Sequence, residues 1–100
     1  MFYIDFGEDS VVVIKGRLDA AQAPTAQMFL DKITGQCVVD LGELEYISSA
    51  GLGVLLRTHK RMIADGLGLK LVNVNSHVND IFTYSGFDKL FDIEPAGGAE

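Results

Sequence analysis

Apolar residues recur along this chain with two different periods, which indicate two kinds of secondary structure. Five segments show the alternation or the short apolar runs that are typical of strands, namely 1–6, 11–14, 37–41, 67–74 and 91–93. Three segments show apolar residues at every third or fourth position, as helices do, namely 21–34, 54–63 and 78–84. The chain therefore opens with two strands and continues with helices and strands in alternation.

Turn and capping residues separate these segments. Loops are expected at residues 7–10, 16–19, 42–45 and 65–66. Pro24 is compatible with the first helix because it lies in the first turn, where no N–H is needed. Asn75 and Ser76 offer an N-cap for the last helix. These residues therefore place the ends of the predicted strands and helices where the apolar periodicity changes.

The same periods predict which side chains face the core. In the first strand these are Phe2, Ile4 and Phe6, and in the first helix Ala26, Phe29, Leu30 and Ile33. In the central helix they are Leu52, Leu55, Leu56, Met62 and Ile63, and in the last helix Val78, Ile81 and Phe82. An opening antiparallel pair followed by parallel βαβ units predicts an α/β fold with a mixed, mostly parallel sheet and helices packed on it. We expect one domain over residues 1–94 and a flexible tail over 95–100.

The segment 46–56 joins a strand to the central helix through two serines and two glycines. The first N–H groups of a helix are unpaired and carry part of its positive dipole, so they stabilise an anion. Ser48 can cap this helix. Gly51 and Gly53 would let a partner's backbone or a ligand approach closely, and tight packing of the helix on the sheet explains them equally well.

These residues carry a resemblance to a known family. Asp40-Leu41 and the run Tyr-Ile-Ser-Ser-Ala-Gly-Leu-Gly-Val-Leu-Leu over 46–56 resemble the signature of the STAS domain, and more narrowly that of small bacterial anti-sigma-factor antagonists. Gly16-Arg17-Leu18-Asp19 is similar to the family's second short motif. The resemblance covers residues 1 to about 93. It implies a four- or five-stranded sheet with helices concentrated on one side.

The resemblance also implies a phosphorylation switch. Ser49 takes the position that a partner serine kinase, itself the anti-sigma factor, phosphorylates, and Ser48 is a second candidate in a position where the family has Asp. The unmodified protein would bind the kinase and free the sigma factor, and a PP2C-type phosphatase would reset the switch. The implied partner-binding residues are Asp19, Ser48, Ser49, Gly51, Gly53, Val54, Arg57 and Arg61. Val54, Arg57, Thr58 and Arg61 are expected to project away from the core. For Asp19, a local turn or capping role is the competing interpretation.

Composition narrows the class of protein. At 48% hydrophobic residues the chain can build a core without disulfides or metals. The single cysteine, Cys37, is expected to be a buried, reduced thiol, and no apolar run is long enough to span a membrane. We therefore expect a cytoplasmic protein. We also expect it to be a monomer by itself. A net charge of −6 disfavours nucleic-acid binding.

The sequence gives little indication of a catalytic site. His59 lies on the apolar face of its helix and is expected to pack there, and His77 is expected to be solvated, so neither serves as a base for a serine nucleophile. We expect neither an enzyme nor a cofactor or metal site. Two other functions remain open. One is a non-switching STAS accessory subunit of a membrane lipid-transport ATPase complex, and the other is a nucleotide-binding STAS module that uses the glycine turn.

Overall fold

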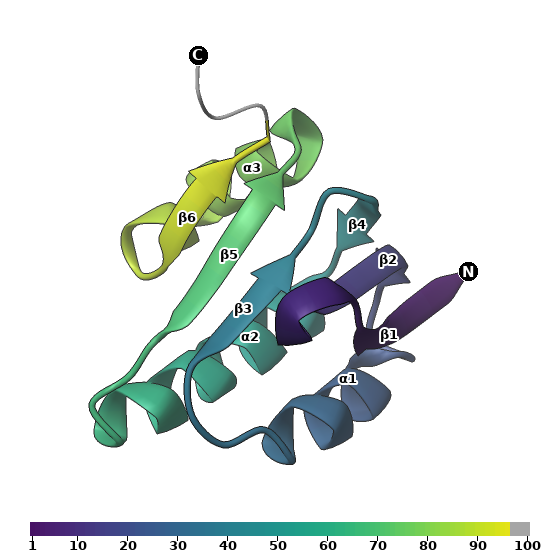
Figure 1. The fold of residues 1–100 in the computed structure, drawn as a ribbon. Coiled ribbons are helices and arrows are strands. Elements are labelled where there is room, and N and C mark those ends of the chain that lie inside the picture. Colours follow the sequence, from purple (N-terminus) through teal and green to yellow (C-terminus); the bar gives the residue numbers. More distant parts are fainter. Residues whose placement is uncertain (97–100) are drawn as a thin grey trace.

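The computed structural model describes residues 1–96 as a mixed β-sheet with three α-helices (Figure 1). The strands are β1 (Phe2–Phe6), β2 (Val12–Leu18), β3 (Cys37–Asp40), β4 (Leu44–Ile47), β5 (Leu69–Val74) and β6 (Asp92–Pro95). The α-helices are α1 (Ala23–Asp31), α2 (Ser49–Ala64) and α3 (Ser76–Ser85), and short 3-10 turns lie at η1 (Glu8–Ser10) and η2 (Phe87–Lys89). The order of elements confirms the α/β class.

The sheet has the order β1-β2-β3-β5-β6, with β4 paired to the far end of β2. β1 and β2 form the expected antiparallel pair, whereas the β2–β3, β2–β4, β3–β5 and β5–β6 pairs are parallel. The sheet thus contains six strands rather than four or five. The additional strand is β4, whose four residues are too short to give a periodic signal.

All three helices cover one face of this sheet. Along β2, Val12, Ile14 and Leu18 are fully buried, whereas Arg17 between them is exposed on the other face. In Figure 1, α2 and α3 lie behind β3, β5 and β6, and no α-helix of residues 1–96 lies in front of these strands. The arrangement confirms that the helices are concentrated on one side.

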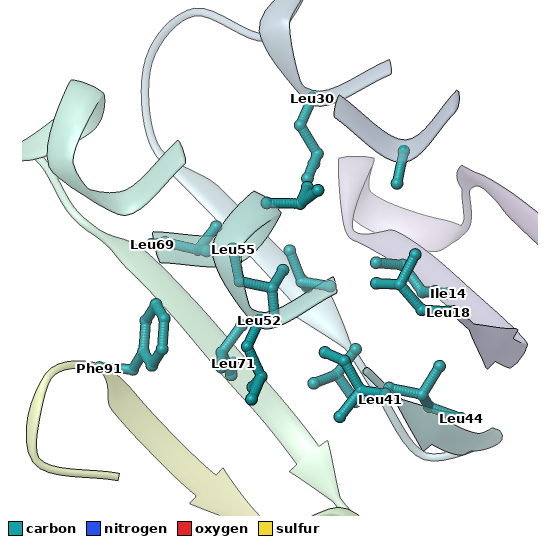
Figure 2. Close-up of a cluster of buried hydrophobic side chains, with 14 of the residues drawn as sticks. Ile14, Leu18, Leu30, Leu41, Leu44, Leu52, Leu55, Leu69, Leu71 and Phe91 are labelled. Carbon is teal, nitrogen blue, oxygen red and sulfur yellow. The ribbon is translucent and has the colours of Figure 1, made fainter. Parts of the chain in front are cut away.

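The core is a single apolar cluster between the sheet and the helices. Figure 2 shows its leucines, contributed by β2, β4, β5, α1, α2 and the turn after β3, together with Phe91, which precedes β6. The Phe91 ring lies 6.1 Å from that of Phe82 in α3. The core therefore joins residues from nearly the whole chain, which fixes where α2 begins relative to the sheet.

Two segments expected as loops are strand instead. Residues 16–18 continue β2 because Arg17 and Leu18 pair with Tyr46 and Ile47 of β4, after a register shift at Gly16. β4 itself begins at Leu44, within the segment 42–45 that was expected to be a turn. Residues 16–18 and β4 are both strands because they form hydrogen bonds with each other.

Two residues expected in the core are half exposed. Phe6, at the end of β1, has 50% of its surface exposed, although its ring contacts that of Phe29 at 5.1 Å. Ile63 has 53% exposed because its neighbour Met62 takes the buried position, and successive residues of a helix point about 100° apart.

Pro95 and Ala96 belong to the segment that was expected to be a flexible tail. Pro95 belongs to β6, and the Ala96 N–H donates to the Val74 carbonyl at 2.9 Å. The remainder of the predicted tail, 97–100, lies outside the described residues. Within residues 1–96, no helix has both the length and the apolar character that crossing a bilayer requires.

Candidate functional site

The site is built around the junction between β4 and α2, where Ser48 caps the helix. The Ser48 hydroxyl accepts a hydrogen bond from the Gly51 N–H at 3.2 Å and donates to the Leu18 carbonyl at 3.3 Å. The Ser48 N–H also donates to the same Leu18 carbonyl at 3.0 Å. Ser48 therefore has the N-cap role expected from the sequence, and it anchors the helix start to the end of β2.

Ser49 occupies the first helical position and is exposed to solvent. Its neighbour Ser48 is half-buried, and the Ser48 hydroxyl is engaged in the cap. The two adjacent serines thus differ in availability, with the Ser49 side chain standing at the positive end of the helix dipole. An enzyme that modifies a serine at this junction would meet Ser49.

Gly51 is required by close packing. A Cβ at this position would lie 2.8 Å from the Leu18 carbonyl oxygen and 2.8 Å from the Ile47 side chain, both too close. Gly51 is also buried. The packing interpretation of this glycine is therefore confirmed, because the first turn of α2 rests directly on the ends of β2 and β4.

Gly53 lies on the outer surface instead, below the side chain of Arg57. The nearest atom to a Cβ at Gly53 would be Nη1 of Arg57, at 3.2 Å. Ser49, Gly53 and Arg57 are four residues apart and therefore form one stripe along α2. Arg57 is exposed, and its Nε donates to Gln27 Oε1 of α1 at 3.1 Å. The glycine lets the guanidinium lie flat on the helix in the direction of Ser49.

Val54 and Thr58 do not project away from the core, contrary to expectation. Both are fully buried, and the Thr58 hydroxyl donates to the Val54 carbonyl at 2.9 Å. Gln27 of α1 lies against Thr58, with Nε2 at 3.4 Å from Oγ1. α1 packs on this flank of α2, so the helix has two covered faces rather than one.

Arg61 lies half-buried on the same flank and binds the end of α1. Its Nη1 and Nη2 donate to the carbonyls of Ile33 and Leu30 at 3.1 and 2.9 Å. Carbonyls at a helix C-terminus have no intrahelical partner, and a cation there is favourable. The geometry gives Arg61 a structural role in joining the two helices.

Asp19 follows β2 and organises the turn before α1. Its Oδ1 accepts from the Gln22 N–H at 3.2 Å, and its carbonyl accepts from the Ala23 N–H at 3.0 Å. The local turn role considered for Asp19 is confirmed. Because β2 and β4 are parallel and end together, Asp19 and the Ser48 junction belong to the same end of the sheet.

Two residues at this end of the sheet were missed as site candidates. The Arg17 guanidinium lies over the Tyr46 ring, 4.5 Å from its centroid. Arg17 is exposed and Tyr46 is half-buried, on the face of the sheet that carries no helix. The Gly-Arg-Leu-Asp motif contained a signal for Arg17, but only the pairing of β2 with β4 brings it beside Tyr46.

The two histidines of the chain lie on α2 and α3. His59 Nδ1 accepts from the Leu69 N–H at 3.1 Å, and its ring lies 5.1 Å from that of Phe91, so His59 packs as expected. His77 is exposed on α3. In the described part of the chain, no three His, Cys, Asp or Glu side chains cluster as metal ligands would.

Comparison with known proteins identifies the family. Residues 5–97 match the STAS domain. The chain belongs to the STAS domain family. Among relatives of this STAS domain, BtrV of Bordetella bronchiseptica, which carries the name of an anti-sigma factor antagonist, is 34% identical over 83% of this chain and 75% of its own. The anti-sigma-B factor antagonist of Bacillus subtilis is 31% identical over 85% of this chain and 81% of its own.

Solved structures agree on the fold. An anti-sigma-factor antagonist (STAS) domain protein from Planctomyces limnophilus matches with a TM-score of 0.72 and 21% identity, covering 92% of this chain and 87% of that one. The Bacillus cell fate determinant SpoIIAA, in its phosphorylated form, matches with a TM-score of 0.67 and 18% identity, covering 99% of this chain and 96% of that one. Both structures contain the fold described above.

Proposed function

We propose that this chain is an anti-sigma-factor antagonist controlled by phosphorylation of Ser49. In its unmodified form it binds an anti-sigma factor that is also a serine kinase, and so frees the sigma factor. A PP2C-type serine phosphatase restores the unmodified form. The proposal draws on two relatives that carry the name of an anti-sigma factor antagonist, each matching most of this chain.

The observation that carries the choice of residue is the difference between the two serines. The Ser48 hydroxyl is held between Gly51 and Leu18, whereas the Ser49 side chain is exposed at the first position of α2. Phosphorylation of Ser48 would remove the helix cap, which is worth about 1 kcal/mol. Phosphorylation of Ser49 leaves the cap in place.

The effect of the phosphate follows from charge. It adds about −1.5 to −2 charges and three acceptor oxygens at Ser49. The helix dipole favours an anion at this position, so the folded protein tolerates it. A partner surface shaped for a neutral hydroxyl does not, because an unpaired charge in an interface costs several kcal/mol. The phosphate therefore blocks docking without unfolding the antagonist.

The proposed docking surface combines the exposed stripe of α2 with the adjoining ends of two strands. It contains Ser49, Gly53 and Arg57 from α2. Asp19, Arg17 and Tyr46 lie at the ends of β2 and β4. Val54 and Thr58 take no part because they are buried. Both signs of charge are present, which suits a protein partner.

Phosphorylation is tested by intact-mass measurement and site mapping of the protein purified from its own host. We expect one added phosphate on Ser49, absent from Ser49→Ala. Ser76 provides a matched control, since it is also an exposed first helical residue that follows a capping residue, Asn75. Ser76→Ala should leave the phosphate unchanged.

Other outcomes of this experiment, and a separate nucleotide titration, distinguish the alternatives. A phosphate on Ser48 would overturn the assignment of the acceptor. The absence of phosphate under all growth conditions, with normal behaviour of Ser49→Ala, would favour a fixed accessory subunit of a transport complex. Saturable binding in a titration with ATP or GTP would favour the nucleotide-binding module.

A further inference from the structure

β1 lies at the border of the sheet and has one free edge. Only β2 pairs with β1 in residues 1–96, since β4 joins β2 on its other side. Figure 1 shows β1 as the outermost strand beside β2, near the N-terminus. A free strand edge presents N–H and C=O groups that another strand can bind.

The hydrogen bonds to β2 show which residues of β1 face this edge. The Arg17 N–H donates to the Met1 carbonyl at 2.8 Å, and the Gly7 N–H donates to the Val11 carbonyl at 2.7 Å. In an antiparallel pair, residues turn their backbone groups alternately toward and away from the partner. Because residues 1 and 7 face β2, the backbone groups of Phe2, Ile4 and Phe6 face outward.

The sequence of this edge is complementary to itself. If two copies of Phe2–Phe6 run antiparallel about Ile4, Phe2 of each copy lies opposite Phe6 of the other, and the two Ile4 residues lie opposite each other. Tyr3 then lies opposite Asp5 on the uncovered face. We propose that this chain forms a homodimer in which two β1 strands pair antiparallel about Ile4 and join the two sheets.

Neighbouring registers are less favourable. A shift that centres the pair on Asp5 places two carboxylates directly opposite each other, which destabilises a cross-strand pair. A shift that centres it on Tyr3 leaves Phe6 beyond the end of the partner strand. Only the register about Ile4 pairs all three outward residues of each strand, Phe2, Ile4 and Phe6.

Exposed apolar side chains flank the proposed contact on the helix side. Phe6 and Met28 have 50% and 65% of their surfaces exposed. A groove of about 320 Å³ between β1 and α1 is lined by Ile4, Thr25, Met28, Phe29 and Lys32. Residues directly opposite in a sheet lie on the same face, so Phe2 of the partner would come beside Phe6 and cover part of this groove.

The strand at the opposite end of the sheet order is less suited to pairing. β6 ends in Pro95, which has no N–H to donate, and its exposed residues Asp92 and Glu94 both carry negative charge. Asp92 would repel its counterpart in a second β6, whereas the charge of Glu94 is partly offset by Lys70, whose Nζ lies 3.5 Å from Glu94 Oε2. Of these two strands, β1 is therefore the better candidate for the dimer contact.

Asp5 limits the strength of the dimer. Its Oδ1 accepts from the Phe6 N–H at 2.8 Å, so one outward donor is already engaged. The carboxylate also lies diagonally across from its counterpart in the register about Ile4. A charged residue on an edge strand is a common means of limiting association. The dimer is therefore weak and concentration-dependent, unlike the monomer expected from the sequence.

Sedimentation equilibrium of the full chain over a range of concentrations tests the dimer. We expect a monomer–dimer equilibrium that Phe6→Lys weakens by about tenfold or more and Asp5→Ala strengthens severalfold. Tyr84→Lys, on the exposed face of α3, is the matched control and should change nothing. A mass that stays monomeric at every concentration, in wild type and Asp5→Ala alike, would overturn the proposal.

Disulfide cross-linking tests the register. Tyr3 and Asp5 are exposed, and across the new edge they form a non-hydrogen-bonded pair, whose Cα separation of about 4.5 Å suits a disulfide. A mixture of Tyr3→Cys and Asp5→Cys proteins should cross-link under mild oxidation, several times faster than either alone. The β1 contact would be overturned if the mixture cross-linked no faster than either single variant. It would also be overturned if the protein were dimeric but the mixture did not cross-link. Neither the sedimentation nor the cross-linking result depends on whether Ser49 is phosphorylated, so the dimer and the proposed function are tested separately.

Discussion

At the scale of single residues, the two glycines at the start of α2 have different roles. Gly51 allows the helix to rest on Leu18 and Ile47, whereas Gly53 allows Arg57 to lie along the helix surface. The distinction matters for function, because only Gly53 belongs to the surface that a partner can reach. The different roles also predict opposite effects on stability when each glycine is replaced by alanine.

Gly51→Ala should destabilise the protein and Gly53→Ala should not. The added methyl at Gly51 would meet the Leu18 carbonyl oxygen at 2.8 Å, and such overpacking costs about 1–3 kcal/mol. At Gly53 it would meet only the flexible end of Arg57, and removing a helical glycine gains about 0.5–1 kcal/mol. Urea unfolding of both variants measures the two effects. Equal stability of Gly51→Ala and wild type would contradict the packing described for the helix start.

Cys37 is the residue whose ionisation the fold changes most clearly. Burial raises the pKa of the Cys37 thiol from 9.0 to about 11, and the nearby charge of Arg61 lowers it only in part. The folded state thus favours the protonated thiol. Its contribution to stability is fully present below pH 9 and is lost as the pH rises toward 11.

The reactivity of Cys37 should follow its burial. At pH 8 we expect a disulfide reagent to modify the native protein very slowly and the urea-unfolded protein rapidly, because only the unfolded thiol is both accessible and able to ionise. The ratio of the two rates is the measurement. Rapid labelling of the native protein at pH 8 would show that β3 opens readily.

At the scale of elements, the contact between α1 and α2 decides which part of α2 remains available. α1 covers the flank formed by Val54, Thr58 and Arg61, so the exposed stripe narrows to Ser49, Gly53 and Arg57. Gln27 links the two helices by contacting both Arg57 and Thr58. The extent of the proposed docking surface on α2 therefore depends on the packing of α1 as well as on α2 itself.

Arg61→Ala should destabilise the protein by loosening the end of α1. The substitution removes hydrogen bonds to the carbonyls of Leu30 and Ile33, and bonds from a charged donor contribute about 1.5–3 kcal/mol each at most. Arg61→Lys should recover only part of the loss, because an ammonium group lacks the planar fork that reaches both carbonyls. Thermal unfolding measures both.

Lys60→Ala is the control for this prediction, since Lys60 is the exposed neighbour on the same helix. It should leave the melting temperature close to that of wild type. If Arg61→Ala were equally neutral, the contacts between Arg61 and α1 would have no energetic weight, and Arg61 would again be a candidate for partner binding.

At the scale of the whole molecule, the Ser49 junction and the free edge of β1 lie on opposite sides of β2, although Met1, at the start of β1, accepts a hydrogen bond from the Arg17 N–H of the proposed docking surface. The Ser49 junction lies where β4 enters α2, and the free edge of β1 lies beyond the opposite side of β2. The phosphate that we propose at Ser49 would therefore lie on the other side of β2 from the proposed dimer contact.

Ser49→Asp should separate stability from partner binding. An acidic residue in the first turn of a helix is stabilising by about 0.3–1 kcal/mol, so thermal unfolding should be unchanged or slightly raised. Binding to the cognate anti-sigma factor, measured by calorimetry, should be lost. Ser76→Asp, at the equivalent position of α3, should keep full affinity. Retained binding of Ser49→Asp would contradict a docking surface that includes this residue.

The sequence alone determined the features that depend on local pattern. The alternation of strands and helices, the burial of Cys37, the packing of His59 and the caps at Ser48 and Asn75 all follow from period, composition or capping chemistry, and the structure confirms them. Each of these features depends on residues that lie close together in the sequence.

Tertiary structure alone decided what depends on contacts between distant segments. β4 is a strand because β2 lies beside it, and Val54 and Thr58 are buried because α1, about 30 residues earlier in the chain, covers a second face of α2. Periodicity reports that one face of a helix is apolar but not how many neighbours it has. Which side chains remain exposed, and so which can bind a partner, is settled only when those neighbours pack.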